Sequence, residues 1–393
     1  MAIKVVTLLI FVYLLVEMPG TSSMVPAVIV FGDSTVDPGN NNQISTVLKS
    51  NFAPYGRDYY GGQPTGRFSN GRIATDFISE AFGIKPVIPA YLDPKYDIRD
   101  FATGVSFASA GTGYDNVTSD VLSVIPFWKE MEYYKEYQSQ LRDYLGNDKA
   151  NQLLSESLYL LSIGTNDFLE NYYTFPTRSS QFPVDKYEDF LIGIASDFVR
   201  ELYNLGARKI AITGLPPMGC LPLERTKNIM HGNACIEEYN DVAKEFNVKL
   251  QSTVDGLNRE LGGIRIVMSN PYDKLLELIQ KPSLFVTASL YIYNHESMQR
   301  SYSRTSETKP FQGPRVVRSV FVFDLHVPQR FEDAATACCG TGYFEMSYLC
   351  DRLNPFTCSN ADKYIFWDSF HPTQKTNFIM ADHVVKTTLA VFR

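Results

Sequence analysis

The sequence predicts an α/β fold, a three-layer α/β/α sandwich built around a mainly parallel, flavodoxin-like sheet. Short apolar runs have the length of buried strands, at 25–31, 157–163, 209–213 and 264–268. Longer segments with helical spacing of apolar residues lie between and after them, at 187–205, 237–261 and 373–391. Strands that alternate with helices of this length favour a parallel sheet covered on both faces.

Each element is predicted from its own residues. The run 25–31 ends at Gly32-Asp33-Ser34, and the other three strand runs are equally short and apolar. In 187–205 the side chains of Phe190, Ile194, Phe198 and Leu202 recur at helical spacing, and Gly206 is a typical stop signal. Ligand sites in sheets of this kind collect in loops at the carboxyl ends of the strands.

Composition and charge limit the classes of function. The 393 residues are 45% hydrophobic and 20% charged, an ordinary globular composition that argues against disorder and coiled coil. The formal net charge is −7, and the chain has no Lys/Arg block long enough to follow a phosphate backbone, so we expect no nucleic-acid partner. We expect one large domain over 24–393.

The N-terminus has the pattern of a secretory signal peptide over 1–23. Lys4 precedes an apolar run at 5–16, which is too short to cross a bilayer and is followed by the small residues Thr21, Ser22 and Ser23. We therefore expect a secreted protein, extracellular or in the cell wall, with no integral membrane anchor. The single Asn-x-Ser/Thr sequon predicts a glycan on Asn116.

Six cysteines, an even number, all lie in the second half of the chain. In an oxidising route they predict disulfides, whose pairing the sequence leaves open. A zinc site is the alternative, but paired Cys-x-x-Cys spacing is absent and adjacent Cys338 and Cys339 are poor tetrahedral ligands.

Four short motifs together suggest nucleophilic catalysis. Ser34 follows the first strand, where a helix cap would be the simpler interpretation of a lone serine. Near the C-terminus, Asp368-x-x-His371 places a carboxylate where it can hold the imidazole Nδ1–H and leave Nε2 as a base. Asn166, after another strand, offers a carboxamide to a developing oxyanion. The glycine-rich loop 107–113 brings backbone N–H groups near a ligand, and it lacks the spacing of a nucleotide loop.

With these motifs in this order, the chain resembles the plant GDSL esterase/lipase family of the SGNH hydrolase superfamily. The resemblance covers nearly all of the chain after residue 23 and rests on seven segments: Phe31-Gly-Asp-Ser-Thr-Val-Asp37-x-Gly39-Asn40-Asn41-Asn42, Pro54-Tyr-Gly56, Pro64-Thr-Gly-Arg67-Phe-Ser-Asn-Gly-Arg72, Leu215-Pro-Pro217-x-Gly219-Cys220, Cys338-Cys339-Gly340 and Phe366-Trp-Asp-Ser-Phe-His371-Pro372, with Gly164-x-Asn166-Asp167. Two positions depart from the family pattern, because Thr35 stands where Leu is expected and Ser106 where Asn is usual.

The resemblance implies a serine esterase or lipase acting on acyl esters or lipids. Ser34 would be the nucleophile, His371 the base and Asp368 its orienting carboxylate. The oxyanion hole would consist of the Ser34 and Gly111 backbone N–H groups and the Asn166 amide, with no metal or organic cofactor. We expect Asp33 and Asp167 to brace their turns. An acyltransferase with the same triad and a catalytically impaired extracellular binding protein remain as alternatives.

Residues 286–329 interrupt the pattern. Relatives in this family join Phe285 and Phe331 through a very short link, whereas here about 44 residues intervene with no sustained helical or strand period. Structureless loops of more than about 15 residues are uncommon in compact domains. Three interpretations are a lid, an insertion without a role, and a retained intron translated in frame, and we favour the last.

Overall fold

The computed structural model describes residues 25–287 and 329–393. Its centre is a five-stranded sheet in which all paired neighbours are parallel, in the order β2-β1-β3-β4-β5. The strands are β1 (Val28–Gly32), β2 (Gly104–Ser106), β3 (Leu158–Ser162), β4 (Lys209–Thr213) and β5 (Arg265–Ser269). This is the flavodoxin-like order, so the fold class predicted from the sequence is confirmed.

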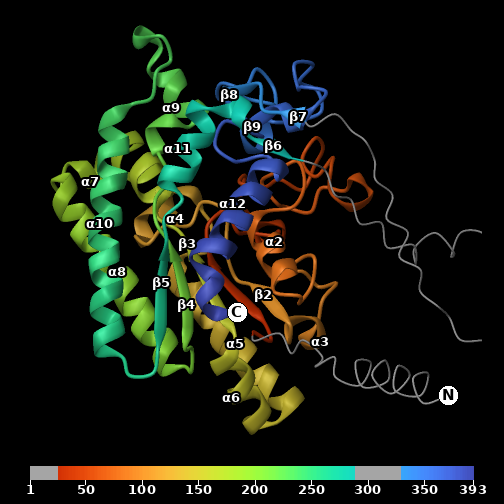
Figure 1. Cartoon of the computed structure of the whole chain (residues 1–393), viewed down its shortest axis with the longest axis vertical. Helices are drawn as coiled ribbons and strands as arrows, with labels where there is room; N and C mark the ends of the chain where they lie inside the picture. Colours follow the sequence, from red (N-terminus) through yellow and green to blue (C-terminus); the bar gives the residue numbers. More distant parts are fainter. Residues whose placement is uncertain (1–24, 288–328) are drawn as a thin grey trace, which may run out of the picture.

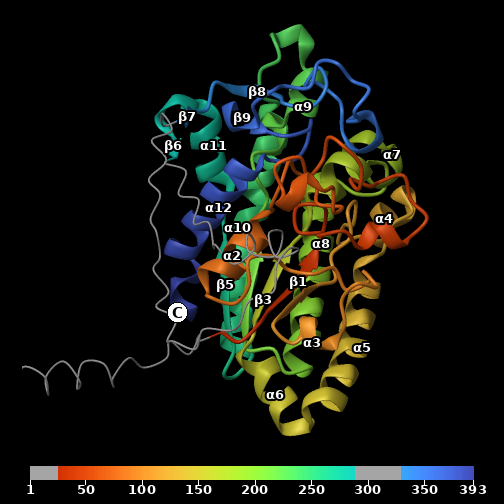
Figure 2. The ribbon, with the colours of Figure 1, turned by 90° about the vertical axis from the view of Figure 1, so that its right-hand side faces the viewer.

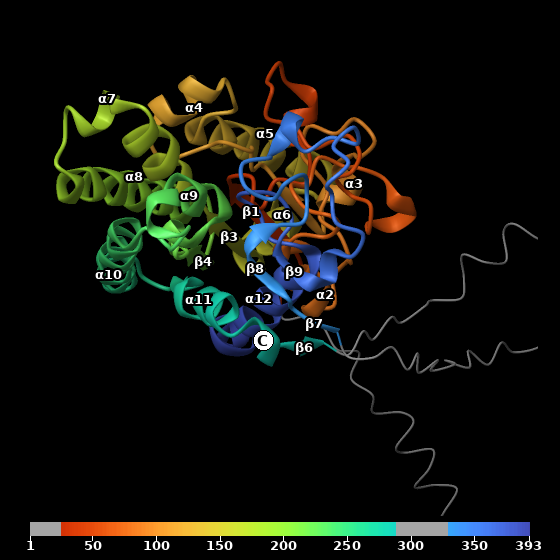
Figure 3. The same ribbon diagram turned by 90° about the horizontal axis from the view of Figure 1, so that it is seen from above.

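Helices cover both faces of this sheet, as the view from above shows (Figure 3). The α-helices are α2 (Ala74–Ala81), α3 (Ile98–Phe101), α4 (Asn116–Leu122), α5 (Phe127–Leu145), α6 (Asn147–Glu156), α7 (Pro176–Ser179), α8 (Val184–Asn204), α9 (Pro222–Lys227), α10 (Glu237–Glu260), α11 (Tyr272–Gln280) and α12 (Gln374–Thr387). Helices α5 and α8 lie on one side of the sheet, and α2 and α12 on the other (Figure 3).

Alternation along the strands divides the core into two layers. In β1, Ile29 and Phe31 face the layer that contains α5, α8 and α10, whereas Val28 and Val30 face α2 and α12. Successive side chains of a strand point to opposite faces, so a wholly apolar strand can fill both layers. This explains why the strand runs in the sequence are continuous rather than alternating.

Two small sheets lie beyond the carboxyl ends of the main strands (Figures 1 and 2). Strands β8 (Asp333–Ala337) and β9 (Tyr364–Phe366) pair in parallel, and β6 (Val286–Thr287) pairs antiparallel with β7 (Gln329–Arg330). The last pair brings the two ends of the atypical segment side by side. Most of that segment, and the expected signal peptide at 1–23, lie outside the described residues.

All six cysteines form disulfides, as expected. The pairs are Cys220–Cys235, Cys338–Cys358 and Cys339–Cys350. The last two close the loops around β8 and β9. Because all six sulfur atoms are bonded in pairs, the disulfides exclude the zinc alternative for these cysteines. Within 25–287 and 329–393, no helix is long and apolar enough to cross a membrane.

Candidate active site

Ser34, His371 and Asp368 form a continuous hydrogen-bonded chain at the carboxyl end of the sheet. Ser34 Oγ lies 2.7 Å from His371 Nε2, and His371 Nδ1 lies 2.8 Å and 2.9 Å from the two carboxylate oxygens of Asp368. All three residues are buried, with exposed fractions of 5%, 2% and 0% in the order Ser34, His371, Asp368. An imidazole held this way donates Nδ1–H to the carboxylate and turns Nε2 to the hydroxyl, where it can accept a proton.

The turn that carries Ser34 is fixed by its neighbours. The Asp33 N–H donates to the Ser162 carbonyl at the end of β3 (3.0 Å), and Asp33 Oδ1 accepts from both the N–H and the hydroxyl of Thr35. Burial raises the pKa of Asp33 to about 6, while the Thr35 hydrogen bonds and the positive charge of His371 act in the opposite direction. Asp33 therefore braces this turn, as the sequence predicted.

Gly32 allows the chain to turn at this point. Its φ is +137°, and a Cβ there would lie 1.9 Å from the Ser162 carbonyl oxygen. A side chain at this position would both strain the backbone and push β1 away from β3. The glycine therefore lets the strand end close to its neighbour and present the next two residues at the sheet edge.

Three N–H donors lie in the loops that follow the neighbouring strands β1, β2 and β3. Among the residues that the structure describes, the Ser34 and Gly111 backbone N–H groups have no acceptor. Asn166 Nδ2 donates one hydrogen to the Thr112 carbonyl (2.9 Å), which orients the amide and leaves its second hydrogen unused. Ser109 N–H donates to the Gly32 carbonyl (2.9 Å) and so ties the glycine-rich loop to the end of β1.

The glycine-rich loop has little room for side chains. Gly111 has φ +90°, and a Cβ there would lie 2.7 Å from Leu48. The segment after Ser34 holds this loop from the other side, because Asp37 accepts the Ala110 N–H (3.1 Å) and Asn41 Nδ2 donates to the Ala110 carbonyl (2.9 Å). Burial raises the pKa of Asp37 to about 6, against several backbone hydrogen bonds that lower it.

Ser106, one of the two departures from the family pattern, is buried and bonded within the same region. Its hydroxyl donates to the Val36 carbonyl (3.0 Å) and accepts the Ala108 N–H (3.3 Å). Asn40 Nδ2 donates to the carbonyls of Ser106 and Ala108, at 2.9 Å and 2.8 Å. The serine therefore contributes to the hydrogen-bonded support of this loop.

Asp167 braces the turn after Asn166, as predicted. Its carboxylate accepts the N–H groups of Tyr114 (2.8 Å) and Asp115 (3.0 Å) and the Thr118 hydroxyl (2.7 Å). Burial raises the pKa of Asp167 to about 7, although these hydrogen bonds lower it. Asn116, the predicted glycan acceptor, is exposed at the start of α4.

Two buried polar residues near the site had no role in the sequence analysis. Glu130 Oε2 accepts the Gly32 N–H (2.9 Å) from within the core, and burial raises the pKa of Glu130 well above its ordinary value. Tyr55 donates its hydroxyl to Asp368 Oδ2 (2.6 Å). The sequence contains a signal for each of these two residues. Glu130 interrupts the apolar helix face of Phe127 and Tyr134, and Tyr55 stands in the Pro54-Tyr-Gly56 motif.

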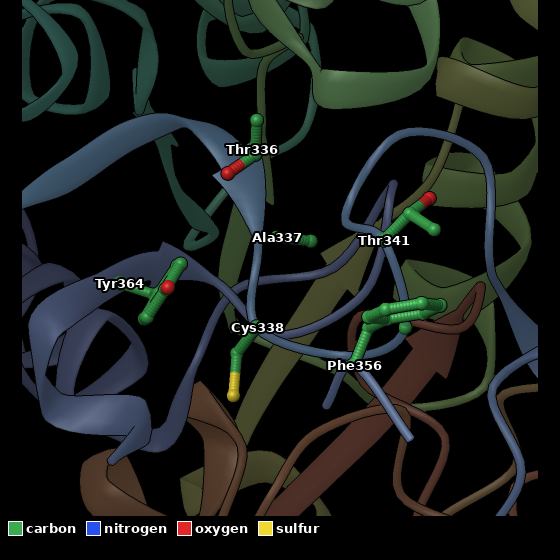
Figure 4. Close-up of a pocket in the computed structure, with 7 residues that line it drawn as sticks. Thr336, Ala337, Cys338, Thr341, Phe356 and Tyr364 are labelled. Atoms are coloured by element: carbon green, nitrogen blue, oxygen red, sulfur yellow. The ribbon is translucent and has the colours of Figure 1, made fainter. Parts of the chain in front are cut away.

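An apolar cavity of about 170 Å³ lies between the sheet and helices α2 and α12. It is bordered by Asp33 and Thr35, on either side of Ser34 in the chain, and by Phe370 and Pro372, on either side of His371. A second pocket, of about 270 Å³, lies over the disulfide-braced segment, where Cys338, Phe356 and Tyr364 line it (Figure 4). Only the first cavity touches the turns that carry the hydrogen-bonded chain.

Comparisons with known proteins agree on one family. The model of the family described as GDSL-like Lipase/Acylhydrolase matches residues 28–384. Among curated proteins of Arabidopsis thaliana, GDSL esterase/lipase At4g26790 is 58% identical over 386 residues, covering 98% of this chain and 97% of the relative. GDSL esterase/lipase At2g04570 is 56% identical over 368 residues, covering 94% and 93%, and GDSL esterase/lipase At2g42990 is 52% identical over 362 residues, covering 92% and 91%.

Proposed function

This chain belongs to the GDSL-like lipase/acylhydrolase family and is a carboxylic ester hydrolase, and we propose that it acts through an acyl-enzyme formed on Ser34. The observation that carries the proposal is the hydrogen-bonded chain from Ser34 Oγ through His371 to Asp368. A neutral serine hydroxyl is a weak nucleophile, and an adjacent base oriented by a carboxylate activates it.

In the proposed reaction, Ser34 Oγ attacks the ester carbonyl carbon while His371 Nε2 takes the hydroxyl proton. The oxyanion that develops is stabilised by the Ser34 N–H, the Gly111 N–H and the Asn166 amide. His371 then returns the proton to the departing alcohol, leaving an acyl group on Ser34. Water activated by the same imidazole hydrolyses this ester and restores the enzyme. A single oxyanion donor typically contributes about 2.7–4 kcal/mol at the transition state.

The substrate class that we propose is an acyl ester with an apolar acyl group, as in a lipid. The support is the apolar cavity that borders the turns of Ser34 and His371. Each CH₂ moved out of water is worth about 0.8 kcal/mol, so kcat/KM should rise up to about fourfold per methylene until the cavity is full. p-Nitrophenyl esters from acetate to octanoate test this, and a cavity-filling Val384→Phe variant should remove the preference for longer chains. A kcat/KM value that does not change with acyl chain length in the wild-type enzyme, as well as in the variant, would contradict the cavity's role.

We propose that the protein is secreted after removal of residues 1–23 and that Asn116 carries a glycan. The three disulfides and the exposure of Asn116 support this proposal. Mass spectrometry of the natural protein tests both parts. The proposal predicts a mature N-terminus near residue 24 and a glycosidase-sensitive mass on the peptide that contains Asn116. An intact N-terminus would overturn the first part, and an unmodified Asn116 the second.

Hydrolysis of p-nitrophenyl butyrate by the purified protein tests the function itself. We expect turnover that Ser34→Ala abolishes, and near-native turnover in that variant would overturn the assignment. An added alcohol acceptor separates the hydrolase from the acyltransferase alternative, because water and alcohol compete for the same acyl-enzyme. Mainly transferred product would favour the transferase. A folded wild-type protein without turnover on any ester would instead favour an extracellular binding protein.

We further propose that 286–329 is an insertion into a single domain spanning 24–393, arising from a retained intron. The pairing of Val286 with Arg330 supports this, because the two ends of the segment lie side by side. Sequencing transcripts across the junction tests the origin. Messages that join Phe285 directly to Arg330 would support it, and a segment present in every message would exclude it.

A further inference from the structure

The carboxylate of Asp368 accepts four donors, and only one comes from outside its own turn. Oδ1 accepts the backbone N–H groups of Phe370 (2.9 Å) and His371 (2.7 Å), and the imidazole Nδ1 lies near both oxygens. The fourth donor is the Tyr55 hydroxyl, 2.6 Å from Oδ2 and 313 residues away in sequence. Apart from the imidazole, Tyr55 is the only donor to Oδ2 among the described residues.

The Tyr55 side chain is held so that its hydroxyl proton points to this carboxylate. The residue is fully buried, and its ring packs edge-on against Phe52, Phe68 and Trp367. The hydroxyl oxygen accepts the Ser347 N–H at 2.9 Å. With that backbone N–H directed at the oxygen, the proton of the hydroxyl is left to donate to Asp368. Burial, reinforced by the charge of Asp368, raises the pKa of Tyr55 well above its ordinary value, so this proton stays in place.

Ser347 is itself anchored in a closed loop. It lies between Cys339 and Cys350, which are joined by a disulfide, and its single hydroxyl hydrogen is shared between the carbonyls of Val47 and Lys49, which lie 2.8 Å and 2.9 Å from the hydroxyl oxygen. The Tyr55 hydroxyl therefore connects the candidate catalytic carboxylate to the disulfide-braced segment. This gives the Pro54-Tyr-Gly56 motif a physical role that the sequence analysis left without one.

We propose that Tyr55 is a positioning residue for the ester hydrolysis, acting on His371 through Asp368. This inference rests on the proposed function. By donating to Oδ2, Tyr55 fixes the plane of the carboxylate and disperses part of its negative charge. Hydrogen bonds to ionised acceptors are roughly twice as strong as those between neutral groups, so a single hydroxyl has leverage here.

The consequence for pH dependence has a definite sign. Without the Tyr55 hydroxyl, Asp368 keeps more negative charge beside the imidazole, and the protonated imidazolium becomes more favourable. Because the reaction needs neutral His371, the acid limb of kcat/KM should move to higher pH. Asp33 interacts electrostatically with His371, and the Arg57 guanidinium carbon lies 4.8 Å from the centre of the Trp367 ring, so both charges face this region. Both remain when only the hydroxyl is removed.

Tyr55→Phe in the full-length enzyme is the direct test, with Tyr159→Phe as its matched control. Tyr159 is also fully buried, and its hydroxyl donates to the Leu154 carbonyl away from the site. For Tyr55→Phe we expect kcat on p-nitrophenyl butyrate to fall about tenfold with KM changed less than about twofold, as for loss of a hydrogen bond to a charged group. The midpoint of the acid limb should rise by about 0.5 to 1 pH unit. Tyr159→Phe should alter neither kcat per folded molecule nor the midpoint of the acid limb.

Two further variants separate positioning from folding. In an Asp368→Asn background the same Tyr55→Phe change should cost less in kcat, because the acceptor is then uncharged. If Tyr55→Phe does not fold, 3,5-difluorotyrosine at position 55 keeps the ring and strengthens the donor, and it should shift the acid limb to lower pH. An acid limb unmoved by either substitution, with kcat per folded molecule unchanged, would overturn the inference. If Ser34→Ala leaves wild-type turnover intact, the proposed function fails instead.

Discussion

Replacing Asn166 by Ala should remove one of the three proposed oxyanion donors and leave the rest of the site in place. Asn166 is 5% exposed, and one amide hydrogen is already committed to the Thr112 carbonyl, so the second is preoriented. Loss of one such donor costs about 10²–10³ in kcat, equivalent to about 2.7–4 kcal/mol. KM should change much less, because the donor is aimed at charge that develops only in the transition state.

The assay combines steady-state kinetics on p-nitrophenyl butyrate with urea unfolding of the same preparations. Asn166→Ala also leaves the Thr112 carbonyl without its partner, which should lower the free energy of unfolding by about 1–3 kcal/mol. Asn247→Ala is the matched control: it is likewise 5% exposed, and its Nδ2 donates to the Leu215 carbonyl at 2.9 Å. That variant should lose stability but keep kcat per folded molecule. A kcat for Asn166→Ala within about threefold of wild type would refute the role.

Three other outcomes are expected. The kcat/KM value should fall at acid pH, because a histidine base must be neutral to accept the serine proton, and a profile flat from pH 5 to 8 would argue against such a base. Burial raises the pKa of Asp167 from 3.8 to about 7, so its contribution to stability is full below about pH 4 and is lost as the pH rises through 7. The test is the free energy of unfolding in urea, measured for wild type and for Asp167→Asn. At 1.36 kcal/mol per pKa unit, the wild-type value minus the variant value should fall by about 4 kcal/mol between pH 4 and 8. A difference that does not depend on pH would contradict the raised pKa. Deleting 286–329, so that Phe285 joins Arg330, should leave Ser34-dependent turnover intact. The free energy of unfolding should stay within about 1 kcal/mol of wild type, since loop length affects closure entropy only weakly. An unfolded product would show that the segment belongs to the domain.

The strands that the sequence predicted well each contain a continuous run of apolar residues. The predicted run 209–213 coincides with β4, and 157–163 and 264–268 differ from β3 and β5 by one residue at each end. Strand β2 (Gly104–Ser106) was missed because three residues carry no measurable period, and its pairing with β1 defines it. The expected helix at 373–391 is shorter in the structure, where α12 ends at Thr387 and a separate 3₁₀ turn follows.

Local signals made Ser34, Asp368, His371 and Asn166 candidate site residues, because each follows a strand or lies in a short motif. The structure brings these four to one edge of the sheet. The role of Tyr55 depends on a contact with Asp368 across 313 residues, which no local pattern encodes. Disulfide pairing was undetermined for a similar reason, since six cysteines allow 15 connectivities and only the fold selects among them.

Labelling of the natural protein with a fluorophosphonate, followed by peptide mass spectrometry, tests the central claim most directly. Such probes react with serines activated by a neighbouring base, and the distance of 2.7 Å between Ser34 Oγ and His371 Nε2 predicts the label on Ser34. Labelling should disappear in His371→Ala, where the hydroxyl loses its proton acceptor. A folded wild-type protein with Ser34 unlabelled, or labelled equally in His371→Ala, would contradict the proposed mechanism.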